Sequence, residues 1–469
     1  MNRPALLALA LVSALCLPPG SSYAAPPAAE APTEASTEAP VGCADPVFPE
    51  PVRADSAAAS RAGLGETGDP TVWLDTCGEV YYRESLRVGP HAVPTAEPAT
   101  AVPAAAGVLG LSSRPSSNRT IYLDFTGHRT ANTAWNRDFG VNAFTSPPFQ
   151  VDGPTSTAFS AVEKEQIRRA WETVAEDYAP FDVNVTTKDP GQAAITRSSA
   201  SDRKFGTRVV VTAGGPLYQR CFCGGIAYLG TFDLAGRQSP VYQPTFVFTN
   251  GSTDQGWLFA ENISHEAGHN LGLDHDGRGR EEYYFGSQRW APIMGASFDK
   301  LSQFSRGEYE RATNTQNDLA IMTRHGIAAR PDDHGDAAGG ATPLPGTDAR
   351  RAAGGVVSTS VDKDAFSFTP TADGPRTITV DPTGGATNLD VQLTLLGSDG
   401  AVLATVNPAP SGDVTRPSPA WLRARWTGDV EAGRRYTVLV DGVGYGDPRT
   451  QGWSGYGSLG AYRVAVTAG

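Results

Sequence analysis

The chain has 469 residues, more than one compact domain usually contains, so we expect two or three domains. Charged residues make up 19% of the chain and apolar residues 40%, which is enough apolar content to build buried cores. The net charge of -12 and the sequence pI near 5.1 disfavour contact with phosphate groups, so we expect neither nucleic acid nor a membrane surface as a partner.

Residues 1–24 have the pattern of an export signal. Arg3 supplies a positive charge, residues 5–17 form a compact apolar run, and Ser22 and Ala24 are small residues at the usual cleavage spacing. The apolar run is too short to favour the alternative, a membrane anchor. We therefore expect a secreted, extracellular protein.

Four cysteines remain once that signal is removed: Cys43, Cys77, Cys221 and Cys223. An even number of cysteines in an exported chain favours disulfides, and three pairings are open. We favour the pairing Cys43–Cys77 together with Cys221–Cys223.

Residues 25–112 have the composition of a partly disordered pro-region. Residues 25–42 and 91–106 are rich in Ala and Pro, and residues 25–42 have almost no aliphatic anchors, which predicts disorder. Residues 43–90, between them, regain apolar side chains such as Trp73. A small ordered piece between two flexible tethers is typical of a pro-region, and a plain N-terminal spacer is the alternative.

Residues 113–328 are expected to form an α/β (α+β) domain with a mixed sheet. Residues 119–125 alternate apolar and polar side chains as a strand does. Residues 159–178 carry one apolar face at helical spacing, and Ser160 with Glu163 makes a capping box at the start of that helix. Further strands are expected at residues 182–187, 207–212 and 244–249, ahead of a second long helix.

The pattern changes after that domain. A closing helix is expected at residues 305–322, with Ser305 and Glu308 as its cap. Residues 329–355 are rich in Asp, Ala, Gly and Pro and are expected to be a linker. Residues 356–469 show short alternating runs without helical periodicity, which predicts an all-β sandwich. Its expected strands are residues 365–368, 376–380, 391–396, 435–440 and 462–466.

The histidine-rich sequence HEAGHNLGLDH begins at His265. His265 and His269 lie one helical turn apart, so both imidazoles project from one helix face toward one metal ion. Gly272 lets the chain leave the helix with a backbone conformation that other residues rarely adopt, which brings His275 round as a third ligand. Glu266 flanks the same site as the general base. Three protein ligands and one open position are typical of one catalytic Zn²⁺ ion.

This motif is similar to that of the metzincin zinc metalloproteases, H-E-x-x-H-x-x-G-x-x-H followed by a Met-turn. Asp276, directly after the third histidine, resembles the reprolysin or adamalysin branch. The Met-turn candidate is Met294, in the sequence APIMG, and the resemblance implies that its side chain forms a hydrophobic floor beneath the zinc. No Tyr lies two residues after Met294, so the fifth-ligand tyrosine of the astacin and serralysin branches is absent. The resemblance covers roughly residues 117–325.

The resemblance implies a zinc endopeptidase that is a monomer and cleaves protein or peptide substrates. In metzincins an edge strand pairs with extended substrate, and residues 225–232 are the candidate for that strand. The upstream pro-region implies a zymogen. Cys77 followed by Gly78 resembles the cysteine switch, in which a thiolate fills the open zinc position, but the favoured disulfide with Cys43 would remove that thiolate.

The C-terminal part resembles the bacterial pre-peptidase C-terminal sandwich in residues 361–368, 388–390 and 456–462. Asp362, Asp364 and Asp390 offer hard oxygen ligands for Ca²⁺, and turn formation is the alternative role for these residues.

Two other functions stay open. One is a cell-surface or matrix binding protein that attaches through the sandwich and carries a catalytically idle zinc domain, and the other is a zinc hydrolase acting on non-peptide amides. Glu266 argues against the first, because a purely structural site has no need of an adjacent base. The remaining histidines are expected to be surface or hydrogen-bonded residues: His91, His128, His325 and His334.

Overall fold

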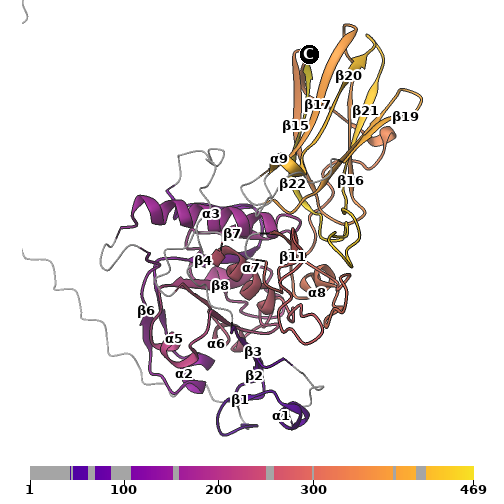
Figure 1. Cartoon of the computed structure of the whole chain (residues 1–469). Coiled ribbons are helices and arrows are strands. Elements are labelled where there is room, and N and C mark those ends of the chain that lie inside the picture. The colour runs from indigo at the N-terminus through magenta and orange to yellow at the C-terminus, as the bar shows by residue number, and fades with distance from the viewer. Residues whose placement is uncertain are drawn as a thin grey trace, which may run out of the picture. The chain divides into compact units, whose positions relative to one another are not determined.

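The computed structural model describes residues 43, 46–61, 69–85, 107–151, 158–249, 258–297, 300–383, 387–407 and 419–469. The expected export signal and the Ala/Pro-rich segments, residues 25–42 and 91–106, lie outside the described residues. Within these ranges the chain is largely β, with mixed sheets and few helices (Figure 1). None of the helices so described is long and apolar enough to cross a bilayer.

An eight-stranded mixed sheet carries the first half of the structure, in the order β1-β2-β3-β9-β10-β8-β4-β7. Strands β10, β8, β4 and β7 are parallel, whereas β1, β2, β3 and β9 each run antiparallel to their neighbours. The strands are β1 Val52–Arg53, β2 Val72–Leu74, β3 Val80–Arg83, β4 Arg119–Asp124, β7 Asn184–Thr186, β8 Phe205–Thr212, β9 Gly225–Tyr228 and β10 Thr245–Phe248.

Both faces of this sheet are covered by apolar cores. Successive side chains of a strand point to opposite sides, so one strand contributes to both cores. On β8, Val209 and Val211 pack with helices α3 (Ala161–Asp177) and α7 (Leu258–Asn270), whereas Val210 faces a second core on the other side. The short helices α2 (Ala134–Asp138), α5 (Pro216–Cys221) and α6 (Gln238–Val241) contribute to that second core (Figure 1).

Helix α3 begins where the sequence predicts. The side chain of its N-cap Ser160 accepts a hydrogen bond from the backbone N–H of Glu163 at 3.1 Å, and the Glu163 carboxylate accepts one from the N–H of Ser160 at 2.8 Å. The predicted capping box is therefore confirmed. Tyr178, at the other end of α3, is buried, and the half-buried Trp171 packs against the same core.

The closing helix is shorter than expected. Helix α8 spans Asp318–Arg324, so the expected helix over residues 305–322 is wrong in its first half, and so is its cap of Ser305 and Glu308. The N-cap is Asn317, whose side chain accepts a hydrogen bond from the N–H of Ala320. Left-handed backbone interrupts the expected helix at Gly307 (φ 69°) and Arg311 (φ 61°).

The C-terminal part is a sandwich of two five-stranded sheets, β13-β16-β21-β18-β19 and β14-β15-β22-β17-β20, packed around a common apolar core. The expected linker over residues 329–355 is wrong in its second half, because β15 (Arg350–Val357) pairs along its whole length with β22 (Gly460–Ala468). The other strands are β13 Thr342–Pro343, β14 Gly346–Thr347, β16 Lys363–Phe368, β17 Gly374–Pro382, β18 Val391–Leu396, β19 Val402–Val406, β20 Ala424–Val430 and β21 Tyr436–Gly442.

The remaining elements are short. They are α1 Ser56–Arg61, α4 Gln192–Ile195, α9 Pro419–Leu422, a 3-10 helix at Ala338–Gly340, and the two-stranded pairs β5 His128–Thr130 with β6 Phe144–Ser146 and β11 Trp290–Pro292 with β12 Leu301–Gln303.

Candidate metal centre

Helix α7 carries His265, Glu266 and His269, and it ends in a turn at Gly272. The backbone of Gly272 is left-handed (φ 87°), and its N–H donates to the carbonyl of His269 at 2.9 Å. This conformation suits glycine because a Cβ would strain it. The turn redirects the chain, so that His275 comes back toward the helix, as the sequence predicts.

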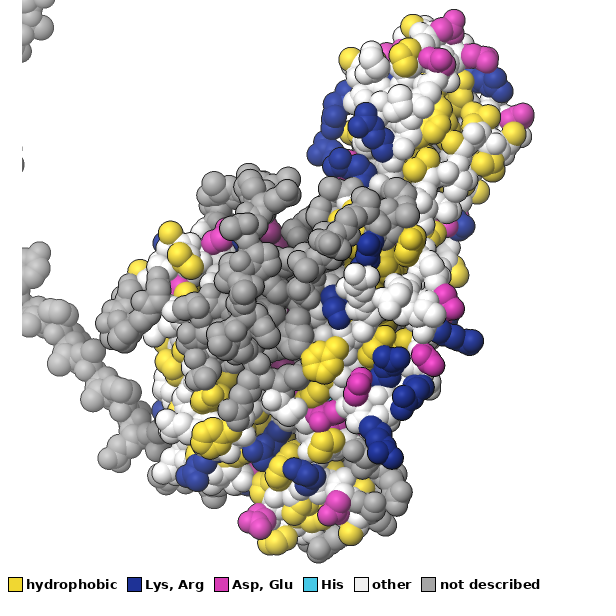
Figure 2. Space-filling view, in the orientation of Figure 1, with side chains coloured by type: hydrophobic (Ala, Val, Ile, Leu, Met, Phe, Trp, Pro, Cys, Tyr) yellow, Lys and Arg dark blue, Asp and Glu magenta, His cyan; other side chains and the backbone are white. Residues whose placement is uncertain are grey.

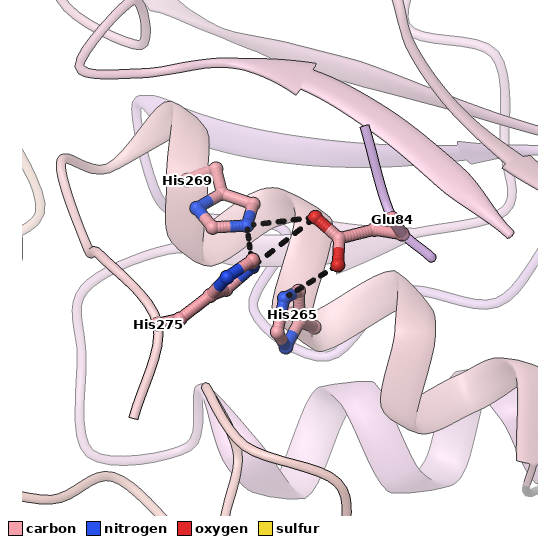
Figure 3. A group of neighbouring side chains, drawn as sticks. All are labelled: Glu84, His265, His269 and His275. Carbon is pink, nitrogen blue, oxygen red and sulfur yellow. Dashed lines mark hydrogen bonds and ion pairs between the residues drawn. The ribbon is translucent and has the colours of Figure 1, made fainter. Parts of the chain in front are cut away.

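The three imidazoles converge on one point (Figure 3). The Nε2 atoms of His269 and His275 are 3.2 Å apart, and one ligand atom from each of His265, His269, His275 and Glu84 lies within 4.8 Å of all the others. All three imidazoles are buried, with 6% or less of each residue exposed. This is the geometry of a metal site enclosed by protein.

The hydrogen bonds of the Nδ1 atoms fix which nitrogen faces inward. His265 Nδ1 lies 2.9 Å from the carbonyl oxygen of Ile293, and His269 Nδ1 lies 2.7 Å from that of Leu273. A carbonyl only accepts, so each Nδ1 carries the proton and each Nε2 keeps its lone pair. Within the described structure, His265 Nε2 has no hydrogen-bond partner although it is buried.

These residues fit a zinc ion. Ligands at about 2.0–2.1 Å from a tetrahedral zinc lie about 3.3 Å from one another. The 3.2 Å between His269 Nε2 and His275 Nε2 matches that spacing. Glu84 Oε1 lies 3.3 Å from the first of these atoms and 3.2 Å from the second, so its carboxylate stands where a fourth ligand would.

Glu84 was not predicted as a site residue. It follows β3, in the segment expected to be a pro-region, 191 positions before His275. Its Oε2 accepts a hydrogen bond from the phenol of Tyr283 at 2.5 Å and lies 3.6 Å from His265 Nε2. Only strand pairing across the sheet brings Glu84 to the histidines, and no spacing rule in the sequence encodes that pairing.

The charges of the cluster balance one another. Burial lowers the pKa of His265 to about 3, so this imidazole is neutral. Burial acts in the same direction on His275, but the carboxylates of Glu84 and Asp69 outweigh it and raise the pKa to about 10. Although burial favours the protonated form of Glu84, the charge of His275 and the hydrogen bonds with His269 and His275 hold the pKa of Glu84 well below its usual range. Without a metal the cluster keeps a proton opposite Glu84, and a divalent cation would supply that positive charge instead.

Glu266 is fully buried beside the histidines. In the described part of the chain neither of its carboxylate oxygens has a hydrogen-bond partner. It packs against β9, where a Cβ built on Gly225 would come within 1.6 Å of Glu266 Oε1. Burial, and then the nearby charge of Glu84, raise the pKa of Glu266 well above its usual value. A small cavity reaches this carboxyl and is lined also by Glu84, His265, Tyr283 and Ser297.

Met294 and Asp276 support the site without facing its centre. Met294 is fully buried, and its sulfur lies against Gly268, between the two histidines of α7. Its carbonyl accepts a hydrogen bond from the N–H of Asp276 at 2.8 Å. The Asp276 carboxylate is buried and accepts a hydrogen bond from the phenol of Tyr309 at 3.3 Å.

Strand β9 does not lie at the edge of the sheet. It spans Gly225–Tyr228 and is paired with β10 on one side and with β3 on the other, so the expected free edge strand over residues 225–232 is wrong in length and in exposure. The side of β9 that faces away from β10 is taken by β3.

The cysteines are joined as Cys43–Cys77 and Cys221–Cys223, which is the pairing that the sequence favours. The cysteine-switch alternative for Cys77 is wrong in this structure, because the sulfur of Cys77 is bonded to Cys43 and is not a free thiolate.

The other described histidines are not among the side chains that converge on the metal centre. His325 Nδ1 is 3.1 Å from Asp233, His334 contacts Thr342 and Gly354, and His128 lies 3.9 Å from Asp124. His91 lies outside the described residues.

The acidic residues of the sandwich are only partly gathered as expected. Carboxylate oxygens of Asp362, Asp364 and Asp332 lie within 4.8 Å of one another. Asp390 is not in that group; its Oδ2 accepts a hydrogen bond from the indole N–H of Trp453 at 3.2 Å. The expected trio is therefore corrected, with Asp332 in place of Asp390.

No family model matches the chain, and no curated protein matches it. Several solved structures resemble a part of it, among them the following three. The pre-peptidase C-terminal domain of a collagenase from Bacillus anthracis is 13% identical, with 30% of this chain and 100% of that chain covered and a TM-score of 0.18. A periplasmic inhibitor of g-type lysozyme from Aeromonas hydrophila is 15% identical over 28% and 96%, with a TM-score of 0.18. A CBM35 module from Cellvibrio japonicus is 17% identical over 30% and 84%, with a TM-score of 0.14. At these identities and TM-scores the likenesses place the chain in no family.

Proposed function

We propose that this protein is a secreted zinc endopeptidase of the metzincin type, of the reprolysin-like branch. The observation that carries the proposal is the convergence of the Nε2 atoms of His265, His269 and His275 beside the buried Glu266. Each imidazole has its other nitrogen engaged, which is how proteins orient histidines toward a catalytic metal.

The chain's own groups account for the remaining chemistry. When bound, zinc would act as a Lewis acid on the scissile carbonyl and make a water molecule acidic enough to attack near neutral pH. Glu266 accepts the proton of the attacking water and passes it to the leaving amine. Neither oxygen of the Glu266 carboxylate is engaged by another group in the described structure, so both are available to carry that proton between the two transfers.

The same carboxyl argues against the alternative of a binding protein with a catalytically idle zinc domain. A buried carboxyl group without partners is costly to fold, and a site that only held a metal would have no use for Glu266. Whether a peptide or another amide is cleaved depends on the substrate groove. Strand β3 already pairs with β9 as an extended chain, and a peptide could pair with β9 in the same way once β3 is displaced, which favours a polypeptide.

The proposal for partners follows the surface charge. Figure 2 shows Lys and Arg side chains on the same described face as Asp and Glu, on a chain of net charge -12. Binding of a phosphate backbone is favoured by a concentrated basic surface, so we propose protein or peptide substrates and neither nucleic acid nor membrane, with a monomeric enzyme.

We also propose that the C-terminal sandwich binds a Ca²⁺ ion. Asp362 Oδ1 and Asp364 Oδ1 belong to buried residues and have no hydrogen-bond partner among the residues that the structure describes. With Asp332 they present three carboxylates to one point, and hard oxygen ligands suit Ca²⁺.

The test is a Glu266→Gln variant of the full chain, with the exposed Glu431→Gln as the matched control. Zinc is measured per chain, and cleavage of casein is followed both on the purified protein and after limited proteolysis. We expect Glu266→Gln to keep about one zinc and to lose at least about 100-fold in cleavage rate, the usual contribution of a general base. Glu431→Gln should match the wild type. Unchanged cleavage by Glu266→Gln would remove the mechanism, and a zinc-loaded wild type that never cleaves would favour the binding protein.

A further inference from the structure

Residues 69–85, which contain the hairpin of β2 and β3, pair with β9 and reach the metal centre at Glu84. Strand β3 pairs antiparallel with β9, with Tyr82 opposite Ala227 and Arg83 opposite Ile226. The pairing continues past β3, because the N–H of Glu84 donates to the carbonyl of Gly225 at 3.1 Å. The carbonyl of Glu84 accepts from the N–H of Gly224 at 2.9 Å. An extended polypeptide therefore already occupies the strand position beside α7.

The side chain at the end of this strand points at the three histidines (Figure 3). Glu84 Oε1 approaches the Nε2 atoms of His269 and His275, and Oε2 approaches that of His265. The residue is buried, and the phenol of Tyr283 holds Oε2 at 2.5 Å. A carboxylate in this position takes the coordination site that water and a substrate carbonyl need.

Two further residues of the same segment contact the imidazoles. The ring of Tyr82 is stacked on that of His269, with 4.0 Å between centroids and 6° between planes, and its phenol donates to Asp274 at 2.9 Å. Asp69 Oδ2 lies 2.7 Å from His275 Nδ1. The segment thus makes specific contacts with two of the three histidines in addition to those of Glu84.

The hairpin that carries Glu84 is anchored away from the site. Its turn residue Asp75 forms an ion pair with Arg137 of α2 at 2.5 Å, and the hydroxyl of Thr76 donates to Asp138 at 2.7 Å. Cys77, in the same turn, is joined to Cys43. These contacts hold the hairpin in register with β9, and therefore fix the reach of Glu84 to the centre.

We infer that residues 69–85 are an inhibitor built into the chain, in which Glu84 is the fourth metal ligand and β3 occupies the place of extended substrate. The inference rests on the proposed zinc site, and it assigns the blocking ligand to a carboxylate and not to Cys77. Removal or displacement of this segment opens the fourth position and one side of β9 at the same time. The full chain is then latent, and it becomes active only after that step.

The test measures access to the metal and does not depend on activity. Full chains carrying Glu266→Gln, which prevents self-cleavage, are loaded with Co²⁺, and acetohydroxamic acid is titrated while the visible spectrum of the metal is recorded. The second substitution is Glu84→Gln, Glu84→Asp or, as the matched control in the same hairpin, Glu79→Gln at an exposed position. Circular dichroism checks that each variant is folded.

We expect acetohydroxamic acid to bind Glu84→Gln at least 10-fold more tightly than the parent chain, with a changed Co²⁺ spectrum before any ligand is added. Glu84→Asp shortens the side chain while keeping its charge, so its affinity for acetohydroxamic acid should lie between those of Glu84→Gln and the parent chain. If Glu84→Gln does not fold, Glu84→Asp is compared with the parent chain in its place. Glu79→Gln should match the parent. Equal affinities with one Co²⁺ bound per chain in all variants would overturn the inhibitor but leave the zinc site standing. Failure of the parent chain to bind Co²⁺ or Zn²⁺ would overturn the proposed function itself.

Discussion

The sulfur of Met294 lies against the backbone of Gly268, so closely that a Cβ built on Gly268 would come within 2.6 Å of Met294 Sδ. Gly268 precedes His269 in α7, and Met294 is fully buried. The helix that carries two of the proposed zinc ligands therefore packs directly against this methionine. How closely the helix approaches Met294 depends on the absence of a side chain at residue 268.

Gly268→Ala should destabilise the protein, although Ala is the better helix former by about 1 kcal/mol. The added methyl must displace a buried sulfur, and overpacking of a core usually costs about 1–3 kcal/mol. We expect a lower thermal midpoint and weaker zinc binding, measured by unfolding with and without zinc. Gly339→Ala is the control, because a Cβ there meets no described atom within 4 Å. A Gly268→Ala protein as stable as the wild type would show that Met294 does not set the position of the helix.

Gly272→Ala should move His275, the third proposed zinc ligand, out of its position at the metal centre. A residue with a side chain adopts left-handed backbone at a cost of roughly 1–2 kcal/mol, and the new Cβ would also lie 2.5 Å from the ring of His325. Gly400→Ala separates the two effects, since Gly400 has a similar φ of 80° but no described atom within 4 Å of its Cβ. We expect both variants to lose stability, and only Gly272→Ala to lose zinc affinity in competition with a chelator. Equal zinc affinities would mean that His275 does not depend on this turn.

The residues that the sequence identifies at the site are those whose positions follow from local geometry. His265, Glu266 and His269 share a helix, and Gly272 fixes the turn to His275, so spacing alone predicts that they meet. Glu84 reaches the same point only because β3 pairs with β9, and strand pairing over such a separation leaves no periodic signal in the sequence. Tyr283, whose ring centroid lies 4.6 Å from that of His275, was not predicted either, because the metzincin pattern places its fifth-ligand tyrosine after Met294 and not before it.

Some strands of the sandwich could also be predicted from local sequence, whereas others form only because of tertiary pairing. Residues 391–396 alternate apolar and polar side chains, and the structure has a strand with those bounds. Strand β15, with the sequence RRAAGGVV, has the composition of a flexible linker, and it is a strand because β22 offers eight consecutive partners. Glycine and alanine carry little preference for strand conformation, so tertiary pairing decides.

Asp390 makes the stability of the sandwich depend on pH. Burial raises its pKa from 3.8 to about 7, which the hydrogen bond from Trp453 only partly offsets. The folded protein therefore keeps a proton that the unfolded chain releases, and stability is lost as the pH rises from 3.8 to about 7. The full effect is on the order of 4 kcal/mol.

Asp390→Asn cannot ionise, so it should raise the thermal midpoint relative to the wild type at pH 8 and leave it nearly unchanged at pH 4.5. The exposed Asp399→Asn is the control and should show no such difference between the two pH values. A wild-type midpoint that is equally far below that of Asp390→Asn at both pH values would show that packing, and not ionisation, separates the two proteins.

The acidic group of the sandwich predicts a dependence on calcium. Asp362 Oδ2 accepts hydrogen bonds from the N–H and the hydroxyl of Ser358 at 2.6 and 2.9 Å, and Asp364 Oδ2 accepts one from the phenol of Tyr462 at 2.6 Å. The second oxygen of each aspartate, Oδ1, is left without a partner in the described structure, and both residues belong to the group that includes Asp332. Each carboxylate is thus oriented by one oxygen while the other is available to a cation, which is how proteins commonly hold Ca²⁺ ligands in place.

Added Ca²⁺ should therefore raise the thermal midpoint of the full chain, and a chelator should reverse the change. A concentration 100-fold above the dissociation constant would stabilise the folded state by about 2.7 kcal/mol. Asp364→Asn should abolish the response, because an amide supplies no charge to the ion, whereas Asp390→Asn should retain it, because Asp390 lies outside the group. Mg²⁺ at the same concentration should act more weakly, since it demands a tighter octahedral set of oxygens than three carboxylates on separate strands and loops provide. If wild type and Asp364→Asn respond to Ca²⁺ alike, the three carboxylates are not its site, and their unpaired oxygens need another explanation.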